Sequence, residues 1–429
     1  MITPSFSLTA TERVLPKLAL DFTTASLDSR VTLTRALNTA TAINSSGNVA
    51  VVNANLPRFD YNPTTLACNG LLIEESRINS TRNNTMAGAV AGTPGTLPTY
   101  WGSFTALTGL TLSVIGTGTE NGIAYLDIRI NGTPSAAGAY NINFDSVGGI
   151  AGLTGQTWTN SAYRRLVGGS LTGVSGIRFG LAEYTAASAF IKQTFAANYA
   201  TVTNAALITQ KASATIATSG GATTAWLLPF DQIILTGVAV DFTLRFGLPQ
   251  FEQGAFATSV IQTSSGAITR NADVATMTGT NFSSWFNATE GAFEVTGSSF
   301  NGAVTKSLLS VDDGTIQNRM TIRRTSTNAM GSLGIASNVT QWNDGTAANT
   351  WVNNTTGSVC LGYKLNNVGF ALNGATTITD TVATIPTVSI LRIGEEVTGA
   401  ATTMCGYIRK ILYWPQKLTN AEITAFSKG

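Results

Sequence analysis

Short stretches in which apolar and polar side chains alternate recur along the chain, and they predict β-strands. Residues 123–130, IAYLDIRI, place Leu126, Ile128 and other apolar residues on one face and polar residues on the other. A period of two is that of a strand with one buried face. An Asn-Gly pair, a strong turn signal, separates this stretch from a second alternating one at 139–144. We therefore expect a hairpin or a pair of neighbouring strands.

The same pattern occurs near both ends of the chain. ATAI (40–43) and VAVV (49–52) flank the turn-forming residues NSSGN, and VGFAL (368–372) precedes another Asn-Gly pair. β-Branched Thr and Val also occupy the polar positions, which suits solvent-facing strands. Long helical patterns are scarce. The sequence thus predicts an all-β fold with two antiparallel β-sandwich (jelly-roll) domains plus an N-terminal β segment.

The domain division follows from where the strand pattern fails. A polar stretch without sustained periodicity, with the turn cluster Ser-Ser-Gly at 264–266, separates the two halves of the chain. The first 80 residues hold too few strands to close a domain, so we expect them to anchor the chain to a partner or to pack on the first sandwich. The predicted division is an N-terminal segment at 1–80, a carbohydrate-module-like β-sandwich at 81–260, a linker at 261–281 and a second sandwich at 282–429.

The chain is unusually poor in charge. Only 11% of its residues are charged, against roughly 25% in ordinary soluble domains. Lys and Arg number 25 against 23 Asp and Glu, and no basic cluster could neutralise a row of phosphates, so we expect no nucleic-acid partner. No apolar run approaches the roughly 18 residues that span a bilayer, so we expect no membrane insertion.

The absence of histidine narrows the chemistry further. With His at 0, Ser-His-Asp and Cys-His catalysis and His-ligated zinc are excluded. Cys68, Cys360 and Cys405 are odd in number and far apart, which favours buried thiols, with a bridge between the last two as the alternative. The lack of a disulfide framework and of a secretory signal at the start indicates assembly in a reducing cytoplasm.

The C-terminal residues form the most recognisable motif. The strand pattern GYIRKILYW (406–414) ends at Pro415, which cannot donate a ladder hydrogen bond. Thr419 and Glu422 have the spacing of a capping box, so a short helix that turns Ile423 toward the core is expected next.

This terminus resembles the concanavalin A-like, laminin-G-like domains near the ends of phage tail and fibre proteins. The matching positions are Gly406, Ile408, Arg409, Ile411, Tyr413, Trp414, Pro415, Leu418, Thr419 and Glu422. The segment PRFDYNPTTLACNGLLIEES (57–76) is similar to a second recurring piece of phage and prophage proteins, from which it departs at Asn62, where Asp is usual. Residues 254–277 look like the join between the two sandwiches of that family, and 157–170 look like a strand of a carbohydrate-binding module.

The resemblance implies a bacteriophage virion structural protein, a tail fibre, spike or head-attached fibre, with a concanavalin A-like lectin domain at 282–429. It implies attachment by non-covalent recognition of a host-surface glycan, with other virion proteins of the neck, tail or capsid and further copies of the chain, as a trimer, as partners. The location implied is the virion, assembled in the host cytoplasm. The alternatives are a capsid decoration or tail-assembly component without a ligand, and a polysaccharide depolymerase.

Adjacent carboxylates do not suggest catalysis. Neighbouring side chains on a strand point to opposite faces, whereas a glycosidase needs two carboxylates that converge about 5–10 Å apart. We therefore expect Glu74 or Glu75 to pair with Arg58 or Arg77 in a buried strand, and the same objection applies to the acidic pair at 395–396. Asp-Asp-Gly at 312–314 is expected to be a turn, because the alternating ligands of a calcium loop are missing. We predict no enzyme activity, no catalytic residue, no metal and no cofactor.

Aromatic residues beside polar turn residues are the remaining candidates for binding. Trp and Tyr rings stack on the apolar face of a sugar, while amide and carboxyl groups bind its hydroxyls. A position in the core or in an interface is the stronger interpretation for each tryptophan, with a ligand platform as the alternative. The candidate carbohydrate-binding residues are Tyr100, Trp101, Trp158, Asn160, Trp342, Asn343 and Asp344.

Overall fold

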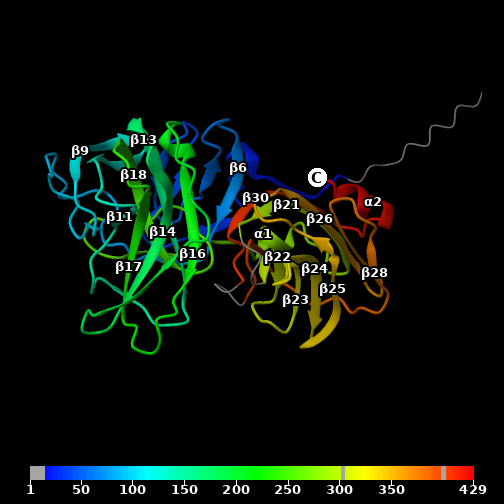
Figure 1. Ribbon diagram of the computed structural model, residues 1–429. Coiled ribbons are helices and arrows are strands. Elements are labelled where there is room, and N and C mark those ends of the chain that lie inside the picture. Colours follow the sequence, from blue (N-terminus) through cyan, green and yellow to red (C-terminus); the bar gives the residue numbers. More distant parts are fainter. Residues whose placement is uncertain (1–14, 301–304, 398–401) are drawn as a thin grey trace, which may run out of the picture.

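The computed structural model describes residues 15–300, 305–397 and 402–429. It consists of two β-sandwiches that lie side by side, with the short helix α2 at the outer end of the second (Figure 1). The predicted all-β fold with antiparallel sheets is confirmed. None of the helices in the described ranges is long and apolar enough to span a bilayer.

The first sandwich is formed by a five-stranded and a six-stranded sheet. Their cores come from the apolar faces of alternating strands, as Leu126 and Ile128 illustrate. The five-stranded sheet runs in the order β16 (Lys211–Ala217), β13 (Thr157–Ser170), β18 (Val240–Gln253), β10 (Ile123–Gly132) and β9 (Leu110–Glu120). The other sheet contains β15 (Phe190–Phe195), β14 (Val174–Tyr184), β17 (Trp226–Leu235), β11 (Gly138–Asn143), β8 (Gly102–Thr105) and the short β12 (Ile150–Ala151) on β17.

The stretches at 123–130 and 139–144 do not form the expected hairpin or neighbouring pair. β10 pairs with β9 and β18, whereas β11 pairs with β8 and β17 in the opposite sheet. The Asn-Gly pair does not turn the chain, because Asn131 and Gly132 continue the ladder of β10 opposite Thr111 and Leu110. Partners distant in sequence therefore override the local turn signal.

The second sandwich contains an eight-stranded and a seven-stranded sheet. The first includes β28 (Ile378–Asp380), β27 (Val368–Leu372), β26 (Gly357–Lys364), β21 (Glu290–Ser299), β30 (Gly406–Trp414), β6 (Cys68–Ile73), β5 (Phe59–Tyr61) and, on β30, β1 (Leu18–Asp21). The second runs β2 (Thr32–Thr34), β20 (Val274–Thr278), β29 (Ile390–Ile393), β22 (Lys306–Asp312), β23 (Arg319–Arg324), β24 (Ala329–Ala336) and β25 (Val339–Thr350).

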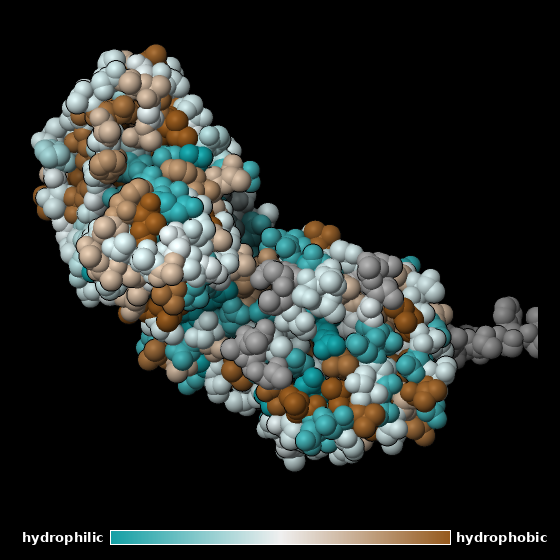
Figure 2. All heavy atoms as spheres, turned by 60° about the horizontal axis from the view of Figure 1, so that its bottom comes forward, coloured by the Kyte–Doolittle hydropathy of each residue, from teal (hydrophilic) through white to brown (hydrophobic). Residues whose placement is uncertain are grey.

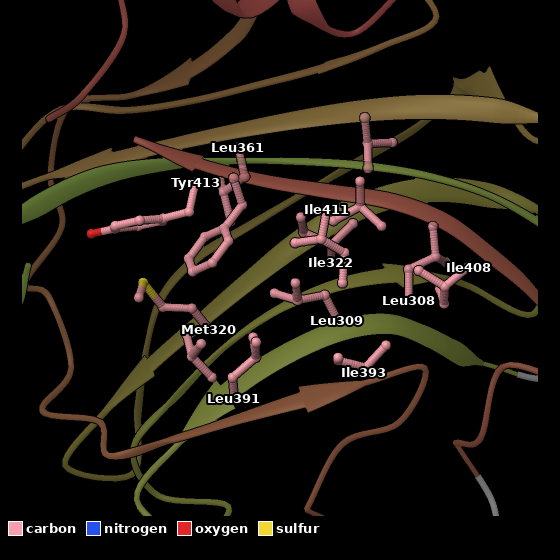
Figure 3. Close-up of a cluster of buried hydrophobic side chains, with 14 of the residues drawn as sticks. Leu308, Leu309, Met320, Ile322, Leu361, Leu391, Ile393, Ile408, Ile411 and Tyr413 are labelled. Carbon is pink, nitrogen blue, oxygen red and sulfur yellow. The ribbon is translucent and has the colours of Figure 1, made fainter. Parts of the chain in front are cut away.

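Aliphatic side chains from both of these sheets meet in one large core. Figure 3 shows Leu309, Ile322 and Leu391 from one sheet facing Leu361 and Ile411 from the other. Trp414 is 2% exposed and lies in a smaller cluster beneath α2 (Asn420–Phe426), where Ile423 is fully buried. The predicted capping box is confirmed, because the Thr419 hydroxyl accepts from the Glu422 amide while the Glu422 carboxylate accepts from the Thr419 amide.

The N-terminal segment pairs mainly with the second sandwich, which differs from packing on the first sandwich, one of the two alternatives that we expected beside anchoring to a partner. β1 and β6 both pair with β30, and β2 pairs with β20. The pairings of β1 and β6 cover an edge of β30 that would otherwise leave its backbone groups unpaired. The hairpin predicted around NSSGN is confirmed as β3 (Ala40–Ile43) and β4 (Val49–Val52).

The segment expected as a linker, 261–281, also contributes strands. It contains β19 (Ile268–Arg270), which pairs with β7 (Arg77–Asn79), and β20, which pairs with β29 of the second sandwich. The remaining short elements are η1 (Phe22–Thr24), η2 (Leu207–Thr209) and α1 (Thr280–Ser283). The join between the sandwiches is therefore ordered by pairing with the N-terminal segment.

The molecule has two lobes with a mixed surface. Figure 2 shows hydrophobic patches beside a hydrophilic band on the lobe of the first sandwich. Such a surface agrees with a composition that is rich in Thr, Asn and Gly and low in charge.

Candidate functional site

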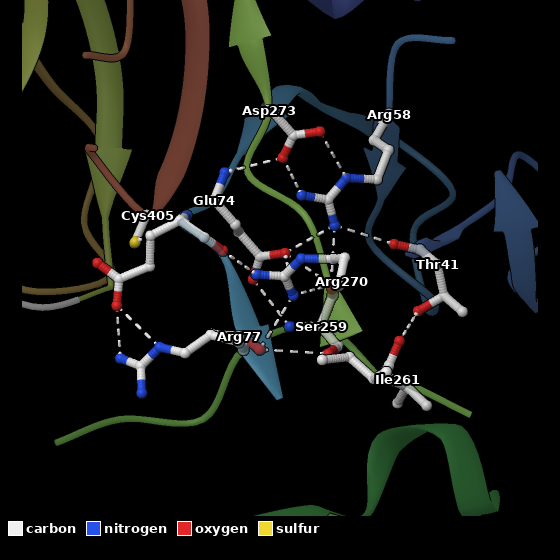
Figure 4. A network of polar contacts seen from close by, with 12 residues as sticks. Thr41, Arg58, Glu74, Arg77, Ser259, Ile261, Arg270, Asp273 and Cys405 are labelled. Atoms are coloured by element: carbon white, nitrogen blue, oxygen red, sulfur yellow. Dashed lines mark hydrogen bonds and ion pairs between the residues drawn. The ribbon is translucent and has the colours of Figure 1, made fainter. Parts of the chain in front are cut away.

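Glu74 of the 57–76 segment lies in a buried ionic cluster between the sandwiches (Figure 4). Arg58 Nη1 lies 2.6 Å from Glu74 Oε2, and Arg270 Nη1 lies 3.0 Å from the same oxygen. Arg58 also pairs with Asp273, whose other partner is Arg35 at 2.8 Å. All five side chains are 0% exposed. The cluster thus contains three guanidinium groups and two carboxylates.

The predicted pairing of Glu74 and Glu75 with arginine is confirmed, but both residues follow β6 and do not lie within the expected strand. Glu74 pairs with Arg58, and Glu75 pairs with Arg77 at 2.7 Å. Lys306 is a second partner of Glu75, also at 2.7 Å. The two acids therefore do not converge on one point.

The charges around Glu74 fix its protonation state. Burial opposes ionisation, but the charges of Arg270 and Arg58 and hydrogen bonds from Ser259 outweigh it and lower the pKa of Glu74 to about 2. A carboxylate with this pKa does not donate a proton near neutral pH, and its oxygens already accept from these partners. The arrangement suits a structural joint, because Glu74 follows β6 of the second sandwich while Ser259 follows β18 of the first.

The tryptophans named as candidates are buried. Trp101, Trp158 and Trp342 are 8%, 5% and 2% exposed, and their indole N–H groups donate within the fold. Trp158 stacks on Phe251 with ring centroids 4.7 Å apart. Because their faces contact other side chains, these rings do not offer the sugar platform we considered.

The polar candidates are likewise spread over the molecule. Asn160 is 1% exposed inside the first sandwich, while Asn343 is exposed and accepts from Arg323. Asp344 lies nearby on β25, and burial raises its pKa. The ring of Tyr100 is covered by the Arg82 guanidinium at 3.9 Å. The candidates therefore do not gather into one site.

A different set of residues forms a groove on the first sandwich, with a volume of about 390 Å³. It lies on the six-stranded sheet, on the face turned away from the core, since Tyr140 and Ile142 of β11 enter the core and the alternate residues point outward. The lining side chains are Phe104, Asn141, Asn143, Tyr184, Phe190, Gln193, Leu228 and Phe230.

The groove combines open aromatic rings with amides. Phe104 and Phe190 are 61% and 58% exposed, whereas Phe230 is 1% exposed and lies within a small apolar cluster. Tyr184 contacts Phe190 edge-to-face with centroids 5.7 Å apart. Rings beside amides match the needs of a sugar, which presents apolar C–H faces and a rim of hydroxyls.

Asn141 contributes a buried amide to the lining of this groove. Its side chain is 5% exposed, and its Oδ1 accepts no hydrogen bond from the described residues. A buried acceptor without a partner costs about 1–3 kcal/mol. Asn143, two residues along the same face, is half-buried and adds a second amide.

Sequence reasoning did not identify this groove, although part of its signal was present. Asn141 and Asn143 occupy the polar positions of the alternating stretch 139–144, which marks the outward face of a strand. Phe104 and Phe190 come from β8 and β15, on opposite sides of the sheet order, so only the pairing of the strands brings the set together.

Comparisons with known proteins give only distant likenesses. No protein-family model matches the chain, and no curated protein sequence matches it. It is similar to the CBM40 of a Ruminococcus gnavus IT-sialidase bound to α2,3-sialyllactose, at 14% identity over 34% of this chain and 87% of that one, with a TM-score of 0.30.

Two further solved structures are similar over about a third of the chain. They are NanB sialidase from Streptococcus pneumoniae, at 11% identity over 35% of this chain and 26% of that one with a TM-score of 0.31, and a leech intramolecular trans-sialidase, at 17% identity over 33% and 24% with a TM-score of 0.29. Likenesses this weak carry no argument about the site or the activity.

Proposed function

We propose that this protein is a bacteriophage virion structural protein, a tail fibre, spike or head-attached fibre, that attaches by binding a host-surface glycan without cleaving it. The observation that carries the binding role is the groove whose lining combines two exposed phenyl rings, Phe104 and Phe190, with the side-chain amides of Asn141 and Asn143. The virion role rests on the resemblance of the C-terminal strand and capped helix. Other virion proteins and further copies of the chain, as a trimer, are the partners we propose.

The chemistry of the groove supports binding without catalysis. Its lining contains aromatic, aliphatic and amide side chains and no carboxylate. Glycoside hydrolysis in its usual form needs two carboxyl groups on either side of the bond. Glu74 lies outside this groove and forms ion pairs with Arg58 and Arg270 in the buried cluster.

The binding role is tested by measuring retention and fragment release on host envelope polysaccharide. We expect the protein to be retained without shortened sugar chains appearing. Phe104→Ala should weaken binding by about 1–2 kcal/mol, roughly five- to thirtyfold in Kd, because the ring loses part of its apolar contact. Leu153→Ala, which removes a 63% exposed side chain outside the groove, is the control and should bind normally.

Three outcomes would contradict the proposal. Release of short fragments would indicate a depolymerase, and failure of retention would favour a decoration or assembly component. Equal binding by the Phe104 and Leu153 variants would place the glycan elsewhere. The virion role is tested separately by locating the chain in images of intact particles, where its absence would overturn it.

A further inference from the structure

A second cavity lies where the two sandwiches meet, and none of the chemistry proposed above uses it. Its volume is about 430 Å³, within the range of about 300–1,000 Å³ typical of small-molecule sites. The hairpin β3–β4, strands β5 and β6, strands β13 and β16 and the segment 255–260 all contribute to its walls, together with Tyr407 of β30.

Lys211 provides a cation on the wall formed by the first sandwich. The residue as a whole is exposed, but it lines the cavity, and its Nζ donates to the backbone oxygen of Thr258 in a partly buried position at 2.9 Å. An ammonium group has three N–H donors, so within the described part of the chain two remain for a ligand. The surrounding walls remove bulk water and lower the pKa of Lys211, while the charges of Glu252, Glu74 and Asp60 oppose this effect.

The wall formed by the second sandwich and the N-terminal segment carries an acidic group, Asp60. Asp60 is 6% exposed and accepts from the Tyr407 hydroxyl and from the Ile43 amide, each at 2.7 Å. Burial raises the pKa of Asp60, against the effect of these hydrogen bonds. The Asp60 carboxyl group can accept a hydrogen bond from a ligand hydroxyl, whereas it would repel a ligand carboxylate.

The remaining lining suits a ligand with many hydroxyl groups. Ser213 and Thr215 project from β16 beside Lys211, and both are exposed. Apolar contact is available from Phe256 and from the ring of Tyr163, whose centroid lies 5.9 Å from Lys211 Nζ. A donor for an anion, acceptors for hydroxyls and apolar surface between them thus share one cavity.

We propose that this cavity binds a saccharide that carries a carboxylate, such as a hexuronic acid unit. The carboxylate accepts from Lys211 Nζ, and hydroxyl groups contact Ser213 and Asp60. The site is independent of the aromatic groove, which has no charged residue in its lining and suits a neutral part of a glycan. The two sites can therefore be tested apart.

The experiment is calorimetric titration of the full chain with a tetrasaccharide of glucuronic acid and with its carboxyl-reduced, neutral counterpart. We expect the acidic form to bind and the reduced form to bind about ten- to a hundredfold more weakly, since a hydrogen bond to a charged group contributes about 1.5–3 kcal/mol. Lys211→Gln should abolish the preference, and Lys211→Arg should keep most of it.

Matched variants show whether the preference for the acidic form depends on Lys211 itself. Lys364→Gln removes the same charge from a side chain that is 52% exposed on the second sandwich, and it should bind like the wild type. Leu153→Ala, at a residue that lines neither the cavity nor the groove, should leave this titration unchanged. Failure of the acidic form to bind at millimolar concentration, equal binding of the two forms, or an unchanged preference in Lys211→Gln would each overturn the proposal. If Lys211→Gln does not fold, the comparison of the two ligands on the wild type and on Lys211→Arg still decides it.

Discussion

Glu74→Gln tests whether the buried ionic cluster stabilises the fold as its geometry indicates. The substitution keeps the size of the side chain but removes the negative charge that Arg58 and Arg270 share. Arg58 keeps Asp273 as a partner, whereas Arg270 keeps, among the residues that the structure describes, only neutral acceptors such as the Thr258 hydroxyl and the Glu75 carbonyl. The variant therefore leaves a buried guanidinium without its carboxylate.

Two arguments give similar magnitudes for this loss. Removing one partner of a buried ion pair costs about 3–5 kcal/mol. Independently, lowering the pKa of Glu74 from its ordinary 4.5 to about 2 corresponds to about 3 kcal/mol of stability at neutral pH. We expect the free energy of unfolding of Glu74→Gln to be about 3 kcal/mol below that of the wild type at pH 7.

The lowered pKa of Glu74 also predicts how the stability difference between the wild type and Glu74→Gln changes with pH. Because the folded-state pKa of Glu74 is depressed, its contribution is complete above the unfolded value of 4.5 and disappears as the pH falls through about 2. The difference between wild type and Glu74→Gln should therefore fall to about half at pH 3.

Urea unfolding followed by tryptophan fluorescence between pH 3 and 7 measures this difference, since Trp285, Trp342 and Trp351 lie in the core of the second sandwich. Glu290→Gln, at the partly exposed pair with Lys364, is the control and should change stability by less than about 1 kcal/mol. A loss below about 1 kcal/mol in Glu74→Gln, or a difference that does not change with pH, would refute the assigned role.

Two further predictions concern the C-terminal helix and the thiols. Thr419→Ala removes the hydroxyl that accepts from the Glu422 amide, and it should lower the free energy of unfolding by about 1 kcal/mol, measured by urea denaturation; a neutral effect would show that the cap is dispensable. Cys360 and Cys405 are buried free thiols, and burial raises the pKa of Cys405 to about 12. In the native protein at pH 8, only the half-buried Cys68 should therefore react readily with a thiol reagent. In urea, all three thiols should react. Rapid native reaction of more than one thiol would contradict this burial.

Local signals in the sequence predicted local structure well. The β3–β4 hairpin, the C-terminal capping box and the pairing of Glu74 with Arg58 involve residues within about 20 positions of one another, and each is confirmed. In each case one short stretch of the sequence contains both interacting partners.

Long-range pairing is what the sequence pattern did not reveal. Leu18 of β1 pairs with Tyr413 of β30, and no periodicity within the first 80 residues points to that partner. The same limit applies to the groove, because Phe104 and Phe190 are brought onto one face by strands that are not adjacent in sequence. An exposed ring and a core ring also look alike in a strand, so the buried tryptophans were candidates and the two phenylalanines were not.

The ionic cluster also bears on how the cavity between the sandwiches would bind a ligand. Glu74 lines the cavity and accepts from Ser259, which lines it as well, while Arg58 donates to the Thr41 carbonyl on a neighbouring wall. These bonds connect walls from three parts of the chain through side chains that exclude water, so the walls are held in place before a ligand enters. A preorganised site loses less conformational entropy on binding. Glu74→Gln should therefore weaken binding of the glucuronic acid tetrasaccharide although Lys211 is intact, and unchanged affinity would show that the cluster stabilises the fold without ordering the cavity.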